Sequence, residues 1–342
     1  MSPDSTPSRP GPEWPRAKLH VVSGKGGTGK STVAAALALA LASTGKDVLL
    51  CEVEGRQGIA RLFDIDSLPY EERRIARGLP VDRVSPGAIH ALHIDAESSL
   101  LDYLAMYYKL GRAGRALDRF GVIEFATTIA PGVRDVLLTG KVYEAARRNA
   151  QTKRAKQYDV IVLDAPPTGR IAQFLNVNGE LAGLAKVGPI KSQADKVMTL
   201  FRSAQTVVHL VTVLEEMPVQ ETVDGIAQLR DADLPVGGVI VNLVRPRDLG
   251  QDDLRAARAG TLDRVQIAAD LKSAKIDVSH EIVDALLVEA SEHAERRALE
   301  DAQRTIVQGL GQPAFELPRL AGGVDLGGLY ELAARLREQG LA

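Results

Sequence analysis

The chain has 342 residues, of which 45% are apolar and 25% charged, and its formal net charge is −2. This composition suits a globular protein with one large core or two small ones, and it excludes a disordered or fibrous chain. The near-neutral charge gives no basic excess for binding along a phosphate backbone, so we expect no nucleic-acid partner. Cys51 is the only cysteine, which excludes an internal disulfide and a four-thiolate metal site within one chain.

The first sixteen residues, MSPDSTPSRPGPEWPR, are rich in Pro, Ser and Gly. They lack the apolar run of a secretory signal, and we interpret residues 1–16 as a disordered tail. No segment reaches the apolar length that crosses a bilayer. Together with the single cysteine, these features favour a cytoplasmic protein whose contact with a membrane would be peripheral.

Short apolar runs alternate with helical patterns through the rest of the chain. This alternation predicts an α/β fold, with a doubly wound, mostly parallel sheet covered by helices on both faces. Residues 17–342 would then form a single domain. The expected strands are residues 18–23, 47–53, 88–94, 159–165, 206–214, 236–244 and 314–318.

More than sixty residues separate the third and fourth expected strands, and their pattern is helical. Such a length is unusual for a simple crossover. A second helical stretch follows the fourth strand, and we predict a helical subdomain over about 97–155 plus 178–203. Its apolar side chains could form a groove for a hydrophobic client, although apolar residues at helical spacing more often pack in a core. The groove candidates are Leu100, Leu101, Leu104, Met106, Leu110, Leu137, Leu138, Leu181, Leu184, Met198 and Leu200.

The stretch GKGGTGKS lies between the first expected strand and a long Ala/Leu helix. It satisfies the pattern G-x-x-x-x-G-K-[ST] in the strand-then-helix context of a phosphate-binding loop. Glycines let backbone amides approach phosphate oxygens, and the helix N-terminus adds its positive dipole end. We expect Lys30 to pair with the β and γ phosphates of ATP and the Ser31 hydroxyl to bind Mg²⁺. The candidate nucleotide-binding residues of this loop are Gly24, Lys25, Gly26, Gly27, Thr28, Gly29, Lys30, Ser31 and Thr32.

Asp164 ends the buried run DVIVLDA. This position places a carboxylate at the carboxyl edge of the sheet, where α/β proteins gather their ligands. A carboxylate there can hold Mg²⁺ through water and complete the phosphate site. The alternative is that Asp164 only caps the next helix.

The loop GKGGTGKST (24–32) resembles the deviant phosphate loop of a group of dimeric ATPases, and further stretches narrow the resemblance. DAPPTGR (164–170) resembles the second switch of the arsenical-pump and tail-anchored-protein-targeting ATPases, and LEEMPVQET (214–222) resembles their segment after a later strand. APGVRD (130–135) and VIVNLVRP (239–246) are weaker similarities. The motifs follow the family's order from about residue 18 to residue 340, so the chain is identified as a member of that family.

This resemblance implies a Mg²⁺-dependent ATPase whose dimer opens and closes with the nucleotide. Lys25 would reach across the dimer interface to the partner's nucleotide, as an arginine finger does; the alternative is a surface lysine near its own phosphate. Asn242 would read the adenine edge, and Pro318 would supply backbone contacts near the base. Glu54 occupies the first-switch position of the Asp that orients the attacking water. Its longer side chain predicts slow or partner-dependent hydrolysis, unless it only caps a helix.

Several functional alternatives stay open at this point. Arg170 replaces the family's His in the second switch and could bind phosphate, a partner carboxylate or a surface acid. The resemblance implies a homodimer, or a heterodimer with a related subunit, that serves anion transport or membrane-protein targeting with a hydrophobic client or membrane partner. Cys51 alone does not suit an iron–sulfur cluster or a thiol site for arsenite. The alternatives are a weakly hydrolysing nucleotide-binding scaffold and a positional ATPase of the partitioning or division-site type, which would need a basic face or a membrane-seeking terminal helix such as 327–342.

Overall fold

The computed structural model describes residues 14–53, 55, 57–81, 83–108, 131–148, 155–176, 189–276 and 278–342. The side chains of 103–108, 131–133 and 189–190 are not described. Glu54, residues 1–13 of the expected tail and parts of the expected helical subdomain lie outside these ranges.

The described strands form one eight-stranded sheet of order β3-β4-β2-β5-β1-β6-β7-β8. All neighbouring strands run parallel except β3, which pairs antiparallel with β4 at the edge. The expected α/β fold and its mostly parallel sheet are confirmed. Sequence reasoning missed β3, because its sequence RRIAR has no apolar run. The strands are β1 Leu19–Gly24, β2 Val48–Glu52, β3 Arg73–Arg77, β4 Ala88–His93, β5 Val160–Asp164, β6 Thr206–Thr212, β7 Val236–Val244 and β8 Ala314–Pro318.

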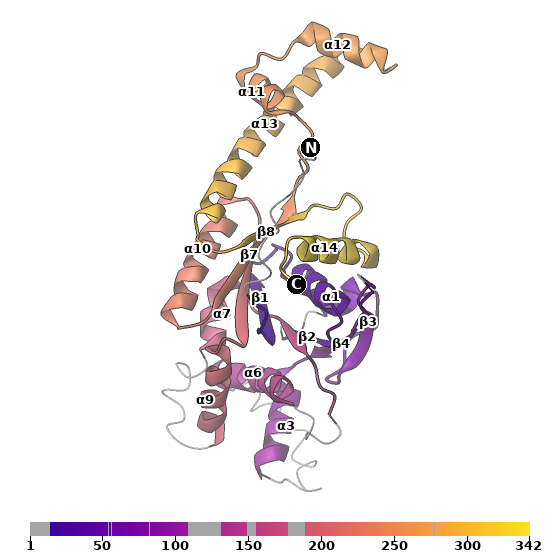
Figure 1. Ribbon diagram of the computed structural model, residues 1–342. Helices are drawn as coiled ribbons and strands as arrows, with labels where there is room; N and C mark the ends of the chain where they lie inside the picture. Colours follow the sequence, from indigo (N-terminus) through magenta and orange to yellow (C-terminus); the bar gives the residue numbers. More distant parts are fainter. Residues whose placement is uncertain are drawn as a thin grey trace, which may run out of the picture.

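Helices cover both faces of this sheet (Figure 1). Along β2, Val48 and Leu50 pack in the core on the α1 side, whereas Leu49 and Cys51 pack in the core on the opposite side. This alternation is the side-chain period of a strand buried on both faces. The helices are α1 Lys30–Ser43, α2 Gly58–Leu62, α3 Ala96–Tyr108, α6 Pro131–Arg147, α7 Thr168–Leu175, α9 Pro189–Phe201, α10 Glu216–Asp231, α11 Gln251–Ala259, α12 Arg264–Ser273, α13 His280–Gln308 and α14 Leu326–Glu338.

The last helix, α14, lies against α1. Its apolar side chains Leu329, Leu332 and Leu336 are buried in the same core as α1. The amphipathic pattern of the terminal helix therefore reflects packing, and these side chains are not free to enter a membrane. None of the helices in the described part of the chain is both long and apolar enough to span a membrane.

Helices α3, α6 and α9 lie together at one end of the molecule, and α11 and α12 lie at the far end of the long helix α13 (Figure 1). The described candidates for a client groove are mostly core residues, since Leu100, Leu137, Leu138, Met198 and Leu200 are buried. The side chains of Leu104, Met106, Leu110, Leu181 and Leu184 lie outside the described residues.

Trp14 lies inside the expected tail, yet its indole packs edge-to-face on the His209 ring, with 5.1 Å between the ring centroids. The Trp14 carbonyl also accepts a hydrogen bond from the amide of Ala17. Trp14 therefore packs against the folded domain, although the sequence places it within the expected tail.

Candidate functional site

The phosphate loop connects the end of β1 to the start of α1, and two of its glycines are required by close contacts. A Cβ at Gly24 would lie 2.2 Å from the carbonyl oxygen of Val211 on β6. Gly29 has φ +86°, and a Cβ there would lie 2.4 Å from Asn242 Nδ2. Lys30, the first residue of α1, is buried at the base of the loop. The sequence pattern and the backbone geometry therefore agree on a loop whose amides are held in a turn above a helix N-terminus.

Asn242 connects this loop to β7. Its Nδ2 donates a hydrogen bond of 2.9 Å to the carbonyl oxygen of Thr28, and its side chain is buried. The next residue, Leu243, has φ +57° where the β7–β8 register shifts, a conformation that is uncommon for a branched side chain. Pro318 ends β8 and pairs with Val244. The two candidate base-contacting residues thus lie near the carboxyl ends of adjacent strands, and their contact with adenine stays a prediction.

Ser31 and Asp164, the candidate Mg²⁺ residues, are in direct contact. The Ser31 hydroxyl in the first turn of α1 donates a hydrogen bond of 2.5 Å to Asp164 Oδ2 at the end of β5. A hydroxyl and a carboxylate are hard oxygen donors, which suit Mg²⁺. No group of three or more His, Cys, Asp or Glu in the described part of the chain could hold a metal ion. Mg²⁺ is usually bound through water, substrate phosphates and one or two carboxylates.

Lys25, the candidate trans-acting lysine, forms an ion pair inside its own subunit. Its Nζ lies 2.8 Å from Oε1 of Glu221 on α10. The other oxygen of Glu221 accepts a hydrogen bond of 3.2 Å from the Thr168 hydroxyl in the second switch. Both charged side chains are about one-third exposed (29% and 35%), so the pair contributes at most about 1 kcal/mol. Lys25 is therefore held in a contact that breaks at little cost.

The second switch also contacts the strand before the phosphate loop and the helical end of the molecule. The Ser23 hydroxyl on β1 donates a hydrogen bond of 2.6 Å to the carbonyl oxygen of Pro166. Arg170 Nη2 lies 3.5 Å from Oδ1 of Asp135 on α6, a residue that is only 2% exposed. Among the roles that the sequence leaves open for Arg170, the structure shows an ion pair. Its partner is Asp135, a buried acid of the same chain.

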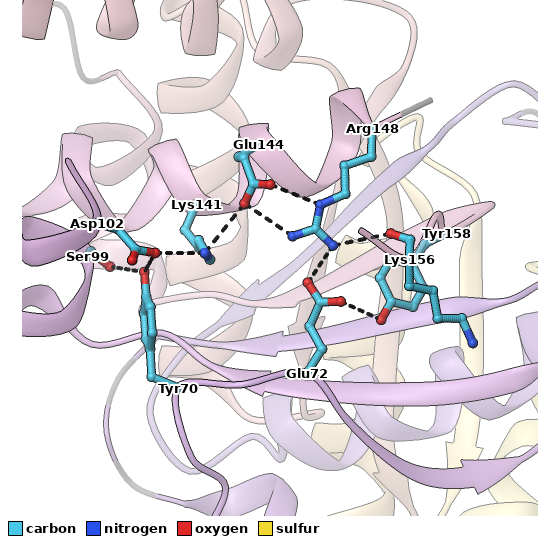
Figure 2. Close-up of polar contacts among 9 residues, drawn as sticks. All are labelled: Tyr70, Glu72, Ser99, Asp102, Lys141, Glu144, Arg148, Lys156 and Tyr158. Carbon is cyan, nitrogen blue, oxygen red and sulfur yellow. Dashed lines mark hydrogen bonds and ion pairs between the residues drawn. The ribbon is translucent and has the colours of Figure 1, made fainter. Parts of the chain in front are cut away.

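A chain of polar contacts fixes the segment after α2 to α3 and α6 (Figure 2). Burial raises the pKa of Tyr70 and of Tyr158, so both hydroxyls stay protonated and can donate hydrogen bonds. The contacts are Tyr70–Asp102 at 3.1 Å, Lys141–Asp102 at 2.8 Å, Lys141–Glu144 at 3.5 Å, Arg148–Glu144 at 3.0 Å, Arg148–Glu72 at 2.5 Å and Tyr158–Glu72 at 2.8 Å.

A cavity of about 480 Å³ opens at the carboxyl ends of β6, β7 and β8. This is the size of a small-molecule site, at the edge where α/β sheets bind ligands. Arg245 in its wall pairs with Glu300 at 2.5 Å, and Glu300 also pairs with Arg297 at 2.8 Å. The lining residues are Val213, Leu214, Glu215, Glu216, Leu243, Val244, Arg245, Arg296, Leu299, Glu300, Gln303 and Arg319.

Sequence reasoning missed two acidic residues near the loop. Glu221 lies within the motif LEEMPVQET, but only the fold shows that it contacts Lys25. Glu52, within the run DVLLCEV, is the last residue of β2 and is buried. The same pattern, an acid at the end of an apolar strand, indicated Asp164 in DVIVLDA and could have identified Glu52. The predicted Glu54 lies outside the described residues.

Comparisons with known proteins identify relatives of this chain. The family model described as anion-transporting ATPase matches residues 17–206, which include the phosphate loop and Asp164. The chain is 49% identical to ATPase BagA of Mycobacterium tuberculosis over 335 residues, 96% of each chain. It is 24% identical over 270 residues to a protein of Aquifex aeolicus described as an arsenical pump-driving ATPase, covering 70% of this chain and 84% of that one. It is 28% identical over 225 residues to ATPase get3 of Aspergillus niger, covering 62% of this chain and 60% of that one.

Proposed function

The chain belongs to the anion-transporting ATPase family and is an ATP hydrolase, and from this premise we propose that it works as a dimer in which Lys25 of each subunit acts on the nucleotide of the other. The observation that carries the proposal is the Lys25–Glu221 ion pair at the entrance of the loop. Lys30 already lies at the base of the same loop and would pair with the phosphates of the subunit's own ATP, so that nucleotide does not need Lys25 as well. Lys25 is partly exposed and weakly held, and it is therefore available to a second site.

Each residue of the site has a role in this proposal. The amides of 24–31 and the Lys30 ammonium bind the ATP phosphates. Ser31 and Asp164 hold Mg²⁺, which neutralises phosphate charge when it is bound. Glu54 orients the attacking water.

The second switch offers a route from the nucleotide to the rest of the molecule. Thr168 contacts Glu221, and Arg170 contacts Asp135 on α6. When Lys25 leaves Glu221 for the partner's nucleotide, Glu221 keeps its bond to Thr168, and the second switch can change its position against α6. We place the coupling to a hydrophobic client or membrane partner at the end formed by α3, α6 and α9, with either an identical or a related second subunit.

Two lysine variants test the proposal. Lys25→Ala should bind a fluorescent ATP analogue as the wild type does, but it should lose turnover by about 10³-fold or more, since it removes a transition-state charge. Lys30→Ala is the contrasting variant, and it should lose ATP binding itself. Weakened ATP binding together with normal turnover in Lys25→Ala would contradict the proposal.

A second candidate function is a nucleotide-binding scaffold with weak hydrolysis. It is favoured by Glu54, whose side chain is one methylene longer than the Asp that orients the attacking water in the family. ATP recovered intact after prolonged incubation, both for the protein alone and with its co-purifying partners, would support the scaffold. Release of phosphate that rises steeply with protein concentration would support the dimeric ATPase.

A further inference from the structure

Three ionisable side chains lie side by side on adjacent strands, and one of them is Asp164, a candidate Mg²⁺ residue. Glu52 on β2 is in register with His93 on β4 and with Asp164 on β5. Neighbouring strands are about 4.8 Å apart, so Glu52 is the immediate neighbour of both. Glu52 follows Val48 and Leu50 in the strand alternation, and these residues pack on the α1 face. The Glu52 carboxylate therefore points to the face on which Ser31 begins α1.

Glu52 is buried, but only one of its two carboxylate oxygens has a hydrogen-bond partner among the described residues. Its side chain is 3% exposed, and Oε1 accepts a hydrogen bond of 2.7 Å from the amide of Gly58 at the start of α2. Oε2 has no hydrogen-bond partner among the described residues, and His93 Nδ1 lies 3.8 Å away without bonding it. A buried carboxylate with an unused acceptor is costly unless another group donates to it.

Gly58 shows that Glu52 and Ser31 border the same space. A Cβ at Gly58 would lie 3.2 Å from Glu52 Oε1 and 3.4 Å from Ser31 Oγ. The absence of a side chain at Gly58 keeps this space open between a carboxylate and the hydroxyl expected to bind Mg²⁺. Acceptors from β2 and β5 thus lie close to one candidate cation position.

We propose that Glu52 is a second acidic residue of the Mg²⁺ site, which accepts hydrogen bonds from water bound to the ion beside Asp164. Mg²⁺ keeps several of its waters, and carboxylates that bind those waters tune its affinity. Glu52 also holds the amide of Gly58, so the ion is linked to the start of α2, directly after the segment that carries Glu54. This inference rests on the proposed binding of Mg²⁺-ATP at the loop.

The test measures how Mg²⁺ changes the affinity for a fluorescent ATP analogue in the full-length protein. Glu52→Gln keeps the size of the side chain and an oxygen for the Gly58 amide, but it removes the charge. The Mg²⁺ concentration that gives half of the affinity gain should rise about 10- to 100-fold. The affinity measured in EDTA should not change. The control is Glu72→Gln, which removes a carboxylate of the polar chain in Figure 2 and should not shift the Mg²⁺ midpoint.

The outcomes separate this inference from the proposed function. A wild-type protein with no Mg²⁺-dependent gain would refute the site itself. A normal gain in the wild type with the same midpoint in Glu52→Gln would overturn only the role of Glu52, as would an equal loss of affinity in EDTA and in Mg²⁺. If Glu52→Gln does not fold by circular dichroism, Gly58→Ala replaces it, because its methyl group enters the shared space. A raised midpoint there supports the proposal, and an unchanged one overturns it.

Discussion

The buried histidine pair between β1 and β6 makes the stability of the protein depend on pH. The amide of Gly238 donates to Nδ1 of His209, so Nε2 of His209 carries the proton and donates to Nδ1 of His20 at 3.1 Å. Protonating His20 would bring two N–H groups face to face in the core. Burial, with Lys46 as a smaller cause, lowers the pKa of His20 from 6.5 to about 4. Burial also lowers the pKa of His209 well below 6.5.

The sign and size of the effect follow from these pKa values. At pH 7 His20 is mostly neutral in the folded and unfolded states and contributes little. Between pH 6.5 and pH 4 the unfolded chain binds a proton that the folded protein rejects, so the free energy of unfolding falls as the pH falls. A pKa of about 4 against 6.5 corresponds to a loss of about 2 kcal/mol by pH 5 and about 3 kcal/mol at pH 4.

Urea unfolding at pH 7 and pH 5, followed by circular dichroism, measures this loss. His20→Asn is the matched variant, because its amide oxygen can accept the hydrogen bond from His209 but does not titrate. We expect the wild type to lose about 2 kcal/mol more than His20→Asn between the two pH values. An equal pH dependence of the two proteins would refute the reasoning.

Three further variants test other contacts. Glu221→Gln weakens the hold on Lys25 and should lower the ATP concentration needed for dimers in light scattering by about 2- to 5-fold, whereas Asp231→Asn at the exposed end of the same helix should not. No difference between the two variants would contradict the idea that Glu221 holds Lys25. Arg148→Ala removes the cation beside Glu72, which keeps its hydrogen bond from Tyr158, and should cost about 3 kcal/mol in urea unfolding; a loss below about 1 kcal/mol, as expected for an exposed pair, would contradict this. Gly24→Ala should lower the free energy of unfolding by about 1–3 kcal/mol and abolish ATP binding, because the added Cβ meets a backbone oxygen. Normal ATP binding would refute that contact.

Local patterns predicted the parallel sheet and most of the phosphate site. Seven strands were expected because each contains a short apolar run, and the eighth, β3, was missed because it is a charged edge strand. Two short motifs predicted that Ser31 and Asp164 lie at one Mg²⁺ site, and the structure brings the two side chains into contact.

The contacts that tie the site to the rest of the molecule could not be predicted from the sequence. Lys25–Glu221 and Arg170–Asp135 join residues that are far apart in the chain. Which acid lies beside each cation depends on how α10 and α6 pack on the sheet, and sequence periodicity does not contain this information. Glu52 is different, because its strand-ending position was visible. The family resemblance points to Glu54, two residues later, and gives no role to Glu52.

The most direct test of trans action by Lys25 is a mixing experiment with two inactive variants. Lys25→Ala retains its own ATP site but lacks the donated lysine, whereas Lys30→Ala lacks the site but retains Lys25. If Lys25 acts across the interface, a mixture of the two proteins regains ATP hydrolysis, because each mixed dimer contains one complete site. If mixed dimers form, as shown by affinity tags on the two variants, and the mixture still does not hydrolyse ATP, Lys25 does not act in trans.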